Sequence, residues 1–223
     1  MTRIVPNPTA RFALALAALA ATPLACAQMQ SAYSENVLKI GIARYDPHSR
    51  TDGLHGIGVP AGADAEVGNA TTLLLTYERM VTPNIGLEFA FGIPPTIKAK
   101  ATGSVAFLGD DVLSAKNIAP TAFVNWHLFS PGDAFRPYIG AGLNYTRFTS
   151  VQSRLASDAK LGDSYGLALQ LGANYAINRD WGLFASIARL NVKSKLVATG
   201  STVLTTTIDF RPLVYSVGGY WQF

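Results

Sequence analysis

Eight segments of the chain alternate apolar residues with polar or small ones at a period of two, which is the pattern of a β-strand with two unlike faces. In the clearest segment, 135–149, the two faces carry Ile139, Ala141, Leu143 and Tyr145 against Gly140, Gly142, Asn144 and Thr146. The other segments are 37–46, 72–80, 85–93, 121–129, 165–175, 181–191 and 213–223. The two faces of 181–191 are less clear than those of the other segments. The pattern predicts an all-β protein with eight strands.

The connections between these segments are long and short in alternation along the chain. The short ones are turns at 82–84, 130–133 and 178–180, whereas the long ones include the Gly-rich stretch 48–70, predicted to lack regular structure, and 94–120, with a helical turn near 112–116. Outer-membrane barrels have short periplasmic turns and long outer loops. We therefore predict an eight-stranded antiparallel transmembrane β-barrel with both chain ends on the periplasmic side; a soluble β-sandwich is the alternative.

The first residues have the composition of a secretory signal sequence. A basic start, an apolar stretch and the small residues of Ala25-Cys26-Ala27 predict a cleaved signal at 1–27 and a single barrel domain at 28–223. A lipoprotein site at Cys26 is the alternative, but Pro23 occupies a position where such sites usually carry leucine. Cleavage after Ala27 is the better prediction.

Composition narrows the function classes further. The chain is 49% hydrophobic and 14% charged, yet no segment after the signal has the roughly 18 uninterrupted apolar residues of a spanning helix. An apolar chain without such helices can enter a bilayer only as a closed barrel.

The net charge and the cysteine count exclude further function classes. Without the signal, sixteen Lys and Arg against fourteen Asp and Glu leave a net charge of +2, and no basic cluster indicates nucleic-acid binding. Because the only cysteine is Cys26, the exported part offers no thiolate for redox or metal chemistry.

Aromatic residues are placed towards the strand ends, as amphipathic rings at the two membrane interfaces would be. Those interpreted as outward-facing are Tyr45, Tyr77, Phe91, Trp126, Tyr145, Tyr175, Trp181 and Trp221. The last segment alternates up to a terminal Phe223, and it resembles the strand that the barrel assembly machinery recognises in outer-membrane proteins. We expect this machinery, outer-membrane lipid and lipopolysaccharide as partners.

Four motifs in a fixed order resemble the OmpW family of eight-stranded outer-membrane barrels, which includes the AlkL-type alkane uptake proteins. They are Ala43-Arg44-Tyr45-Asp46-Pro47, Ala119-Pro120-Thr121, Phe135-Arg136-Pro137-Tyr138-Ile139-Gly140-Ala141-Gly142-Leu143-Asn144-Tyr145 and Val214-Tyr215-Ser216-Val217-Gly218-Gly219-Tyr220. The resemblance extends from about residue 37 to the end. It implies a narrow passage for small hydrophobic molecules, from an outer apolar pocket to a sideways exit into the bilayer. No residue at 53–62 matches a ligand-gating position of the family.

An apolar pocket is predicted near the outer end of the barrel. Its candidate lining is Leu74, Ile208, Phe210, Pro212 and Val214. The wall is predicted to be incompletely paired near four prolines, which lack the N–H that a strand ladder needs: Pro94, Pro95, Pro120 and Pro212. Alternatively, the apolar groups only fill a closed, inert barrel, as is common in barrels of this size.

A polar plug is predicted lower in the barrel. Its candidate residues are Lys39, Glu88, Asn125, His127, Asn144, Gln170 and Asn174. Buried charges need partners, so Lys39 and Glu88 are expected to pair within a network of amides that holds the barrel shut to ions and water. A proton or ion path is the alternative role.

Catalysis or metal binding would have to use the histidines. His48, His55 and Asp52 lie in the Gly-rich stretch, whose geometry the sequence does not fix, whereas nucleophile activation and metal binding both need fixed partners. We therefore predict no enzyme, no cofactor and no metal. Two functions remain: passive uptake of small hydrophobic molecules, and a structural or surface-interaction barrel without transport.

Overall fold

The computed structural model describes residues 35–47, 50–51, 55–56, 59–154, 158–199 and 203–223. The predicted signal sequence and its alternative lipidation site at Cys26 lie outside these residues. His48 and Asp52 also lie outside them, and the side chain of His55 is not described.

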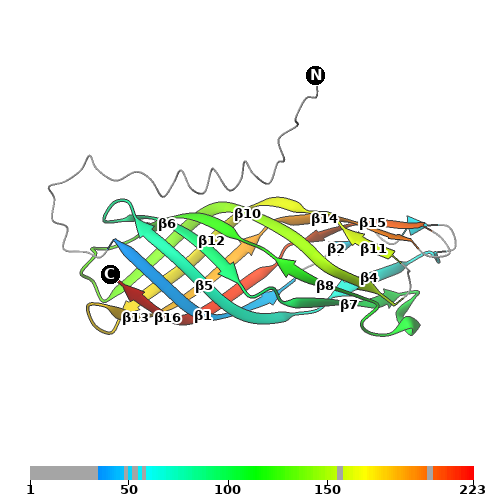
Figure 1. Ribbon diagram of the computed structural model, residues 1–223, viewed down its shortest axis with the longest axis horizontal. Helices are drawn as coiled ribbons and strands as arrows, with labels where there is room; N and C mark the ends of the chain where they lie inside the picture. Colours follow the sequence, from blue (N-terminus) through cyan, green and yellow to red (C-terminus); the bar gives the residue numbers. More distant parts are fainter. Residues whose placement is uncertain (1–34, 48–49, 52–54, 57–58, 155–157, 200–202) are drawn as a thin grey trace, which may run out of the picture. The chain divides into compact units, whose positions relative to one another are not determined.

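Eight strands form a closed antiparallel barrel, as the sequence pattern predicts (Figure 1). In chain order they are β1 (Asn36–Asp46), β5 (Ala70–Met80), β6 (Ile85–Gly92), β9 (Thr121–His127), β10 (Phe135–Ser153), β12 (Ser164–Ala176), β13 (Trp181–Leu190) and β16 (Leu213–Gln222). Each pairs with its neighbour, β16 pairs with β1, and the pairing of β10 with β12 completes the ring. The wall therefore has no free edge among these strands.

The strands slant steeply, as Figure 1 shows. Following paired residues once around the ring leads from Ala176 to Gly166 of the same strand, a displacement of ten residues. A displacement of ten in an eight-stranded barrel corresponds to a strand tilt of about 40°. A barrel of this size has an interior that side chains can fill.

The alternation in the sequence separates the two faces of the wall. Large apolar side chains that point outward are exposed in the isolated chain, among them Ile40, Leu73, Val124, Leu143, Leu167, Leu171 and Val217. The inward positions between them carry small, polar or charged residues such as Lys39, Thr76, Asn125 and Ser216, which are buried. This is the arrangement of a barrel whose outer face contacts lipid.

The long connections contain more regular structure than predicted. They form β4 (Ala63–Val67), β7 (Thr96–Gly103), β8 (Leu113–Ile118), β11 (Asp158–Leu161), β14 (Val192–Thr199) and β15 (Val203–Phe210), with the short bridges β2 (Arg50–Thr51) and β3 (His55–Gly56). The helical turn expected near 112–116 was wrong, since this segment begins β8 and the helical turn lies at Ala106–Leu108. Because β10 continues to Ser153, its upper part offers an edge with which β8 pairs.

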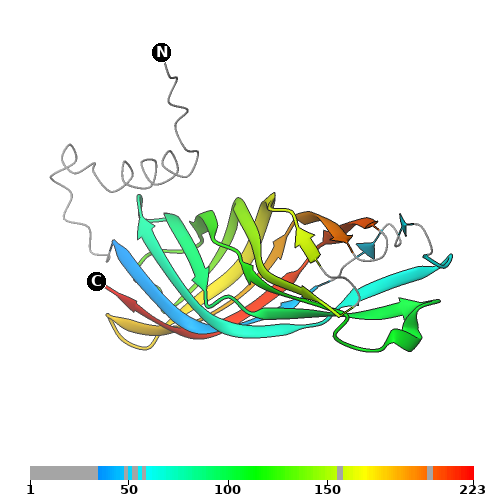
Figure 2. The same cartoon turned by 45° about the vertical axis from the view of Figure 1, so that its right-hand side comes forward.

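These extensions lie at the end of the barrel opposite the short turns and the carboxy terminus (Figures 1 and 2). β14 pairs with β15 directly above the pairing of β13 with β16, so this hairpin extends beyond the barrel ring. We refer to this end as the outer end. No helix among the described residues is long and apolar enough to cross a membrane.

Candidate functional site

The lower interior is organised around a buried lysine between two carboxylates. Lys39 Nζ lies 2.7 Å from Glu88 Oε2 and 3.0 Å from Glu78 Oε2. Glu78 and Glu88 face each other directly across β5 and β6, where two like charges would repel. Lys39, whose side chain is only 1% exposed, therefore bridges two carboxylates that the hairpin register forces together and reduces their repulsion.

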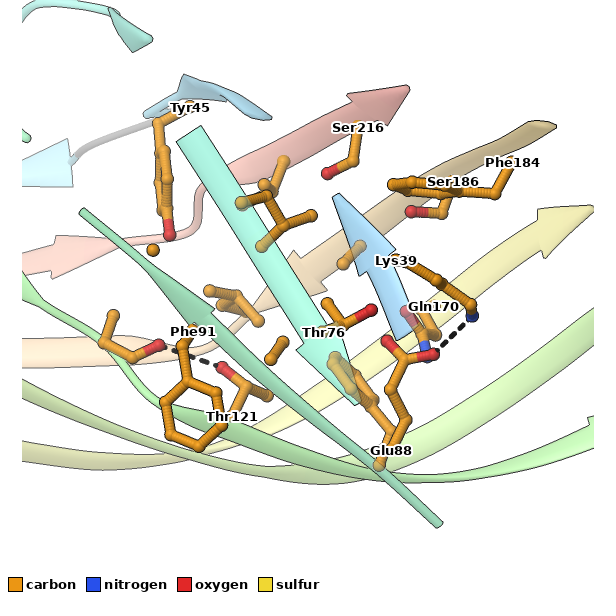
Figure 3. Close-up of a pocket in the computed structure, with 18 of the residues that line it drawn as sticks. Lys39, Tyr45, Thr76, Glu88, Phe91, Thr121, Gln170, Phe184, Ser186 and Ser216 are labelled. Atoms are coloured by element: carbon orange, nitrogen blue, oxygen red, sulfur yellow. Dashed lines mark hydrogen bonds and ion pairs between the residues drawn. The ribbon is translucent and has the colours of Figure 1, made fainter. Parts of the chain in front are cut away.

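Two amides and a histidine complete this polar plug. Asn125 Nδ2 donates to Glu78 Oε1 (2.8 Å) and Glu88 Oε2 (2.9 Å), while its Oδ1 accepts from Gln170 Nε2 (2.6 Å). His127 Nε2 lies 2.7 Å from Glu78 Oε1. The amide of Asn125 thus joins three neighbours at once, and the plug spans strands from opposite sides of the ring. Figure 3 shows its members Lys39, Glu88 and Gln170 close together.

Glycines on the inward face make room for these large polar groups. A Cβ at Gly140 would collide with Asn125 Oδ1 and with the side chain of Gln170, and a Cβ at Gly86 would collide with the carboxylate of Glu78. The small inward residues therefore determine where the polar side chains can cross the lumen.

Two of the predicted plug residues do not join this network. Asn144 is buried but donates to Thr121 Oγ1 at 2.8 Å, and its Oδ1 accepts from Thr146 Oγ1 at 2.6 Å. Asn174 is buried, and its Oδ1 has no hydrogen-bond partner among the described residues. The plug consists of Lys39, Glu78, Glu88, Asn125, His127 and Gln170, so Glu78 is the member that sequence reasoning missed.

A cavity of about 40 Å³ lies against the plug. Lys39, Glu88 and Gln170 border it on one side, while Leu74 and Val214 contribute apolar walls. In Figure 3, the plug residues and Tyr45 lie at different sides of this space. The cavity is therefore polar towards the plug and mainly apolar elsewhere, with a few hydroxyl groups such as those of Ser186 and Ser216; we call it the inner cavity.

A second cavity of about 30 Å³, here called the outer cavity, is lined mainly by apolar residues, among them Phe210 and Pro212. Both cavities share Tyr45, Ala119 and Leu190, so they adjoin. Ile208 does not line either cavity but is buried in the same apolar cluster as Phe210 and Val214. The predicted pocket residues thus lie together around this apolar outer compartment.

The barrel wall is interrupted beside the inner cavity. The ladder between β6 and β9 ends at Ala90 opposite Thr121, and the next backbone hydrogen bond above it is Asn117 N to Pro95 O at 3.0 Å. Between these points, no backbone hydrogen bond joins 91–94 to 118–120. Phe91, Gly92 and Ala119 line the inner cavity, so the cavity reaches this gap in the wall, here called the β6–β9 seam.

Three of the four prolines predicted to lie at incompletely paired positions of the wall do so, and the fourth does not. Pro94, Pro95 and Pro120 border the β6–β9 seam. At Pro212 the wall is paired, because Leu190 N donates to Pro212 O (3.1 Å) and β16 pairs with β1 up to Leu213. The expectation of an unpaired wall at Pro212 was therefore wrong; its carbonyl still accepts even though its nitrogen cannot donate.

Tyr45 also differs from its sequence interpretation. It was expected at an outward interface, but it lines both cavities and packs against the apolar cluster. Tyr45 lies two residues after Ala43, on the same face of β1 as Lys39 and Gly41, so the alternation of β1 itself turns it inward.

The described residues include no group of three His, Cys, Asp or Glu side chains arranged to hold a metal ion.

A closed eight-stranded barrel with an apolar outward band and a hydrogen-bonded interior is the architecture of a small outer-membrane protein. The model of the OmpW family matches residues 34–223. The chain belongs to the OmpW family, and its place is the bacterial outer membrane.

Relatives and a solved structure agree with this assignment. Outer membrane protein W of Vibrio cholerae is 31% identical, over 93% of this chain and 95% of the relative. The dibenzothiophene metabolism operon protein PahQ of Pseudomonas aeruginosa is 33% identical, over 76% of this chain and 79% of the relative. The crystal structure of OprG from Pseudomonas aeruginosa superimposes with a TM-score of 0.79 at 25% identity, covering 86% of this chain and 96% of OprG.

Proposed function

We propose that this protein lets small hydrophobic molecules cross the outer membrane passively. They enter the apolar outer compartment, pass from the outer to the inner cavity, and leave sideways through the β6–β9 seam into the lipid. The single observation that carries this proposal is the position of the inner cavity, which lies above a hydrogen-bonded plug and borders the gap in the ladder.

The plug makes a sideways exit easier than a path straight through the lumen. A vertical path would separate Lys39 from Glu78 and Glu88, and separating a buried ion pair costs about 3–5 kcal/mol. A sideways path displaces only apolar groups at the seam, of which Phe91 is already 46% exposed on the outer wall. The plug would at the same time exclude ions and water.

The cavities are small in the state described by the structure. An apolar cavity that holds benzene is about 150 Å³, whereas the inner cavity has about 40 Å³. Passage therefore requires side chains to move, and Tyr45 and Leu190 are the two large residues among the three shared by both cavities. We propose these two as the constriction between them.

The relatives add chemical support. PahQ is named for an operon of dibenzothiophene metabolism, and dibenzothiophene is an apolar aromatic compound. The resemblance to AlkL-type alkane uptake proteins points to the same class of permeant.

We propose that the protein has no catalytic role. The ring nitrogen His127 Nε2 contacts Glu78, and no serine or threonine hydroxyl within the described residues contacts the ring.

Uptake by cells with and without this protein tests the proposal. Entry of a labelled medium-chain alkane or fatty ester should be faster with the protein, while entry of a small hydrophilic sugar should not change, because the plug closes the lumen. Unchanged entry of both probes would contradict transport. Altered adhesion or envelope integrity with unchanged entry would instead favour a structural or surface-interaction barrel.

A further inference from the structure

Five cations point outward near the outer end of the barrel on neighbouring strands. They come from β8, β10, β13 and β14 and are exposed: Lys116, Arg147, Arg189, Lys193 and Lys195. Among the described residues, no carboxylate lies within ion-pair distance of four of them, and Lys193 reaches Asp209 only at 3.9 Å. We call these residues the outer basic patch.

The strand register brings the patch together around two tyrosines. Thr149 is opposite Lys116, so Lys116 and Arg147 are diagonal neighbours on the outward face. Tyr145 is opposite Tyr165, and their ring centroids are 4.8 Å apart. Lys193 N donates to Ser164 Oγ at 2.9 Å, which places the start of β14 beside Tyr165. The tyrosine pair thus has cations on both sides.

The height of the patch follows from β12. Its outward residues run from Tyr175, at the periplasmic end, through Leu171, Leu169 and Leu167 to Tyr165. Ten steps of about 3.3 Å at a tilt of about 40° span roughly 25 Å, the height of the apolar band of an outer-membrane barrel. Tyr165, 70% exposed, therefore marks the upper interface. The patch residues of β8, β10 and β14 lie at this level of the outer-leaflet headgroups, whereas Arg189, opposite Leu169, lies below them on β13.

On the outer extension β7, by contrast, both lysines are paired within the protein. On β7, Lys98 Nζ lies 2.7 Å from Asp111 Oδ2, and Lys100 Nζ lies 3.0 Å from Glu66 Oε2. Within the patch region, the carboxylate of Asp163 accepts a hydrogen bond from the Tyr145 hydroxyl at 2.7 Å. The positive charge of the patch is therefore in excess, and it faces the membrane interface.

We propose that the outer basic patch binds the phosphorylated sugar headgroup of a lipopolysaccharide molecule in the outer leaflet. Arginine pairs with phosphate through parallel N–H donors, and lysine contributes a point charge. Basic sites at membrane interfaces bind anionic lipid headgroups in the same way. The exposed ring of Tyr165 and the partly exposed ring of Tyr145 offer an apolar surface with polar tips to the sugars between the phosphates. This inference is independent of the transport proposal.

Binding of purified lipid A to the full chain in detergent tests the proposal, with bound lipid counted by native mass spectrometry. The triple variant Lys116→Gln, Arg147→Gln, Lys193→Gln should bind lipid A roughly tenfold more weakly than the unmodified protein. A matched triple variant, Arg79→Gln, Lys98→Gln, Lys100→Gln, removes the same charge from residues already paired and should change affinity by less than about twofold. Heat-modifiable gel migration shows that each variant is folded.

Lipid A without its phosphates should bind the unmodified protein as weakly as lipid A binds the patch variant. Equal affinities of the two triple variants would overturn the proposal. Phosphatidylglycerol binding as tightly as lipid A would also overturn it, because the patch would then attract any anionic lipid rather than lipopolysaccharide.

Discussion

The lower and upper halves of the barrel interior are built on different principles. Below, six polar side chains share one network, in which Lys39, Glu78 and Glu88 are at most 4% exposed. Above, apolar residues leave two small adjoining cavities, and the wall between β6 and β9 lacks hydrogen bonds over several residues. We infer from this difference that stability resides mainly in the lower half, and we propose that permeation uses the upper half.

This division has a physical reason. Unpaired buried charges are costly, so a polar plug is tolerated only when every charge has a partner. Apolar groups have no directional requirement and can be displaced at a smaller cost. Substitutions in the two halves should therefore have separable effects, on unfolding free energy below and on uptake above.

The largest expected effect comes from Lys39→Met. It leaves Glu78 and Glu88 facing each other without a cation, and removing one partner of a buried ion pair costs about 3–5 kcal/mol. Urea unfolding of the barrel in lipid vesicles should show this loss. Adding Glu78→Gln and Glu88→Gln should restore much of it, because no buried charge is then unpaired. A Lys39→Met protein as stable as the original would contradict the assigned role of the plug.

A moderate effect is expected from Gly140→Ala. The added methyl group collides with Asn125 and Gln170, and overpacking of this kind costs about 1–3 kcal/mol. Gly219→Ala is the matched control, since the nearest atom to its added Cβ is 3.7 Å away. The same unfolding assay should separate the two variants, and equal stability would mean that the plug can rearrange around the methyl group.

Phe91→Ala at the β6–β9 seam should have the smallest effect on stability, but it should change the rate of uptake. Phe91 is half-exposed and lines the inner cavity, so its truncation widens the proposed exit. Uptake of a hydrophobic probe should rise several-fold. Phe135→Ala, which removes a ring of similar exposure at the periplasmic end, should leave uptake unchanged. Equal rates for both variants would argue against an exit at this seam.

The strands and their faces were predictable because alternation is a local property of the sequence. The eight predicted segments agree with the barrel strands to within a few residues, and Lys39 and Glu88 form the expected pair. Glu78 was missed because its role depends on register. The symmetry of the short turn predicted at 82–84, centred on residue 83, places Glu78 opposite Glu88, and this signal could have identified it.

Other features depend on distant pairing that no local pattern reveals. The extensions β7, β8, β14 and β15 form because neighbouring long connections satisfy one another's backbone groups. The prolines indicated weak pairing at three positions of the seam but also at Pro212, where a carbonyl alone maintains the contact. The faces of 181–191 were unclear in the sequence, and the structure turns Phe184 inward against Val37 and Tyr220.

The most direct test of lateral exit closes the β6–β9 seam covalently. The last residue pair of the β6–β9 ladder is Ala90 with Thr121, and continuing the ladder by two residues would place Gly92 opposite Ala119. In the double variant Gly92→Cys, Ala119→Cys, oxidation can therefore form a disulfide across the seam. Ala173→Cys with Ala185→Cys, across a fully paired seam, is the control. Oxidation, verified by mass spectrometry, should abolish hydrophobic uptake only in the first pair, and reduction should restore it. Undiminished uptake through the oxidised 92–119 barrel would contradict exit at this seam.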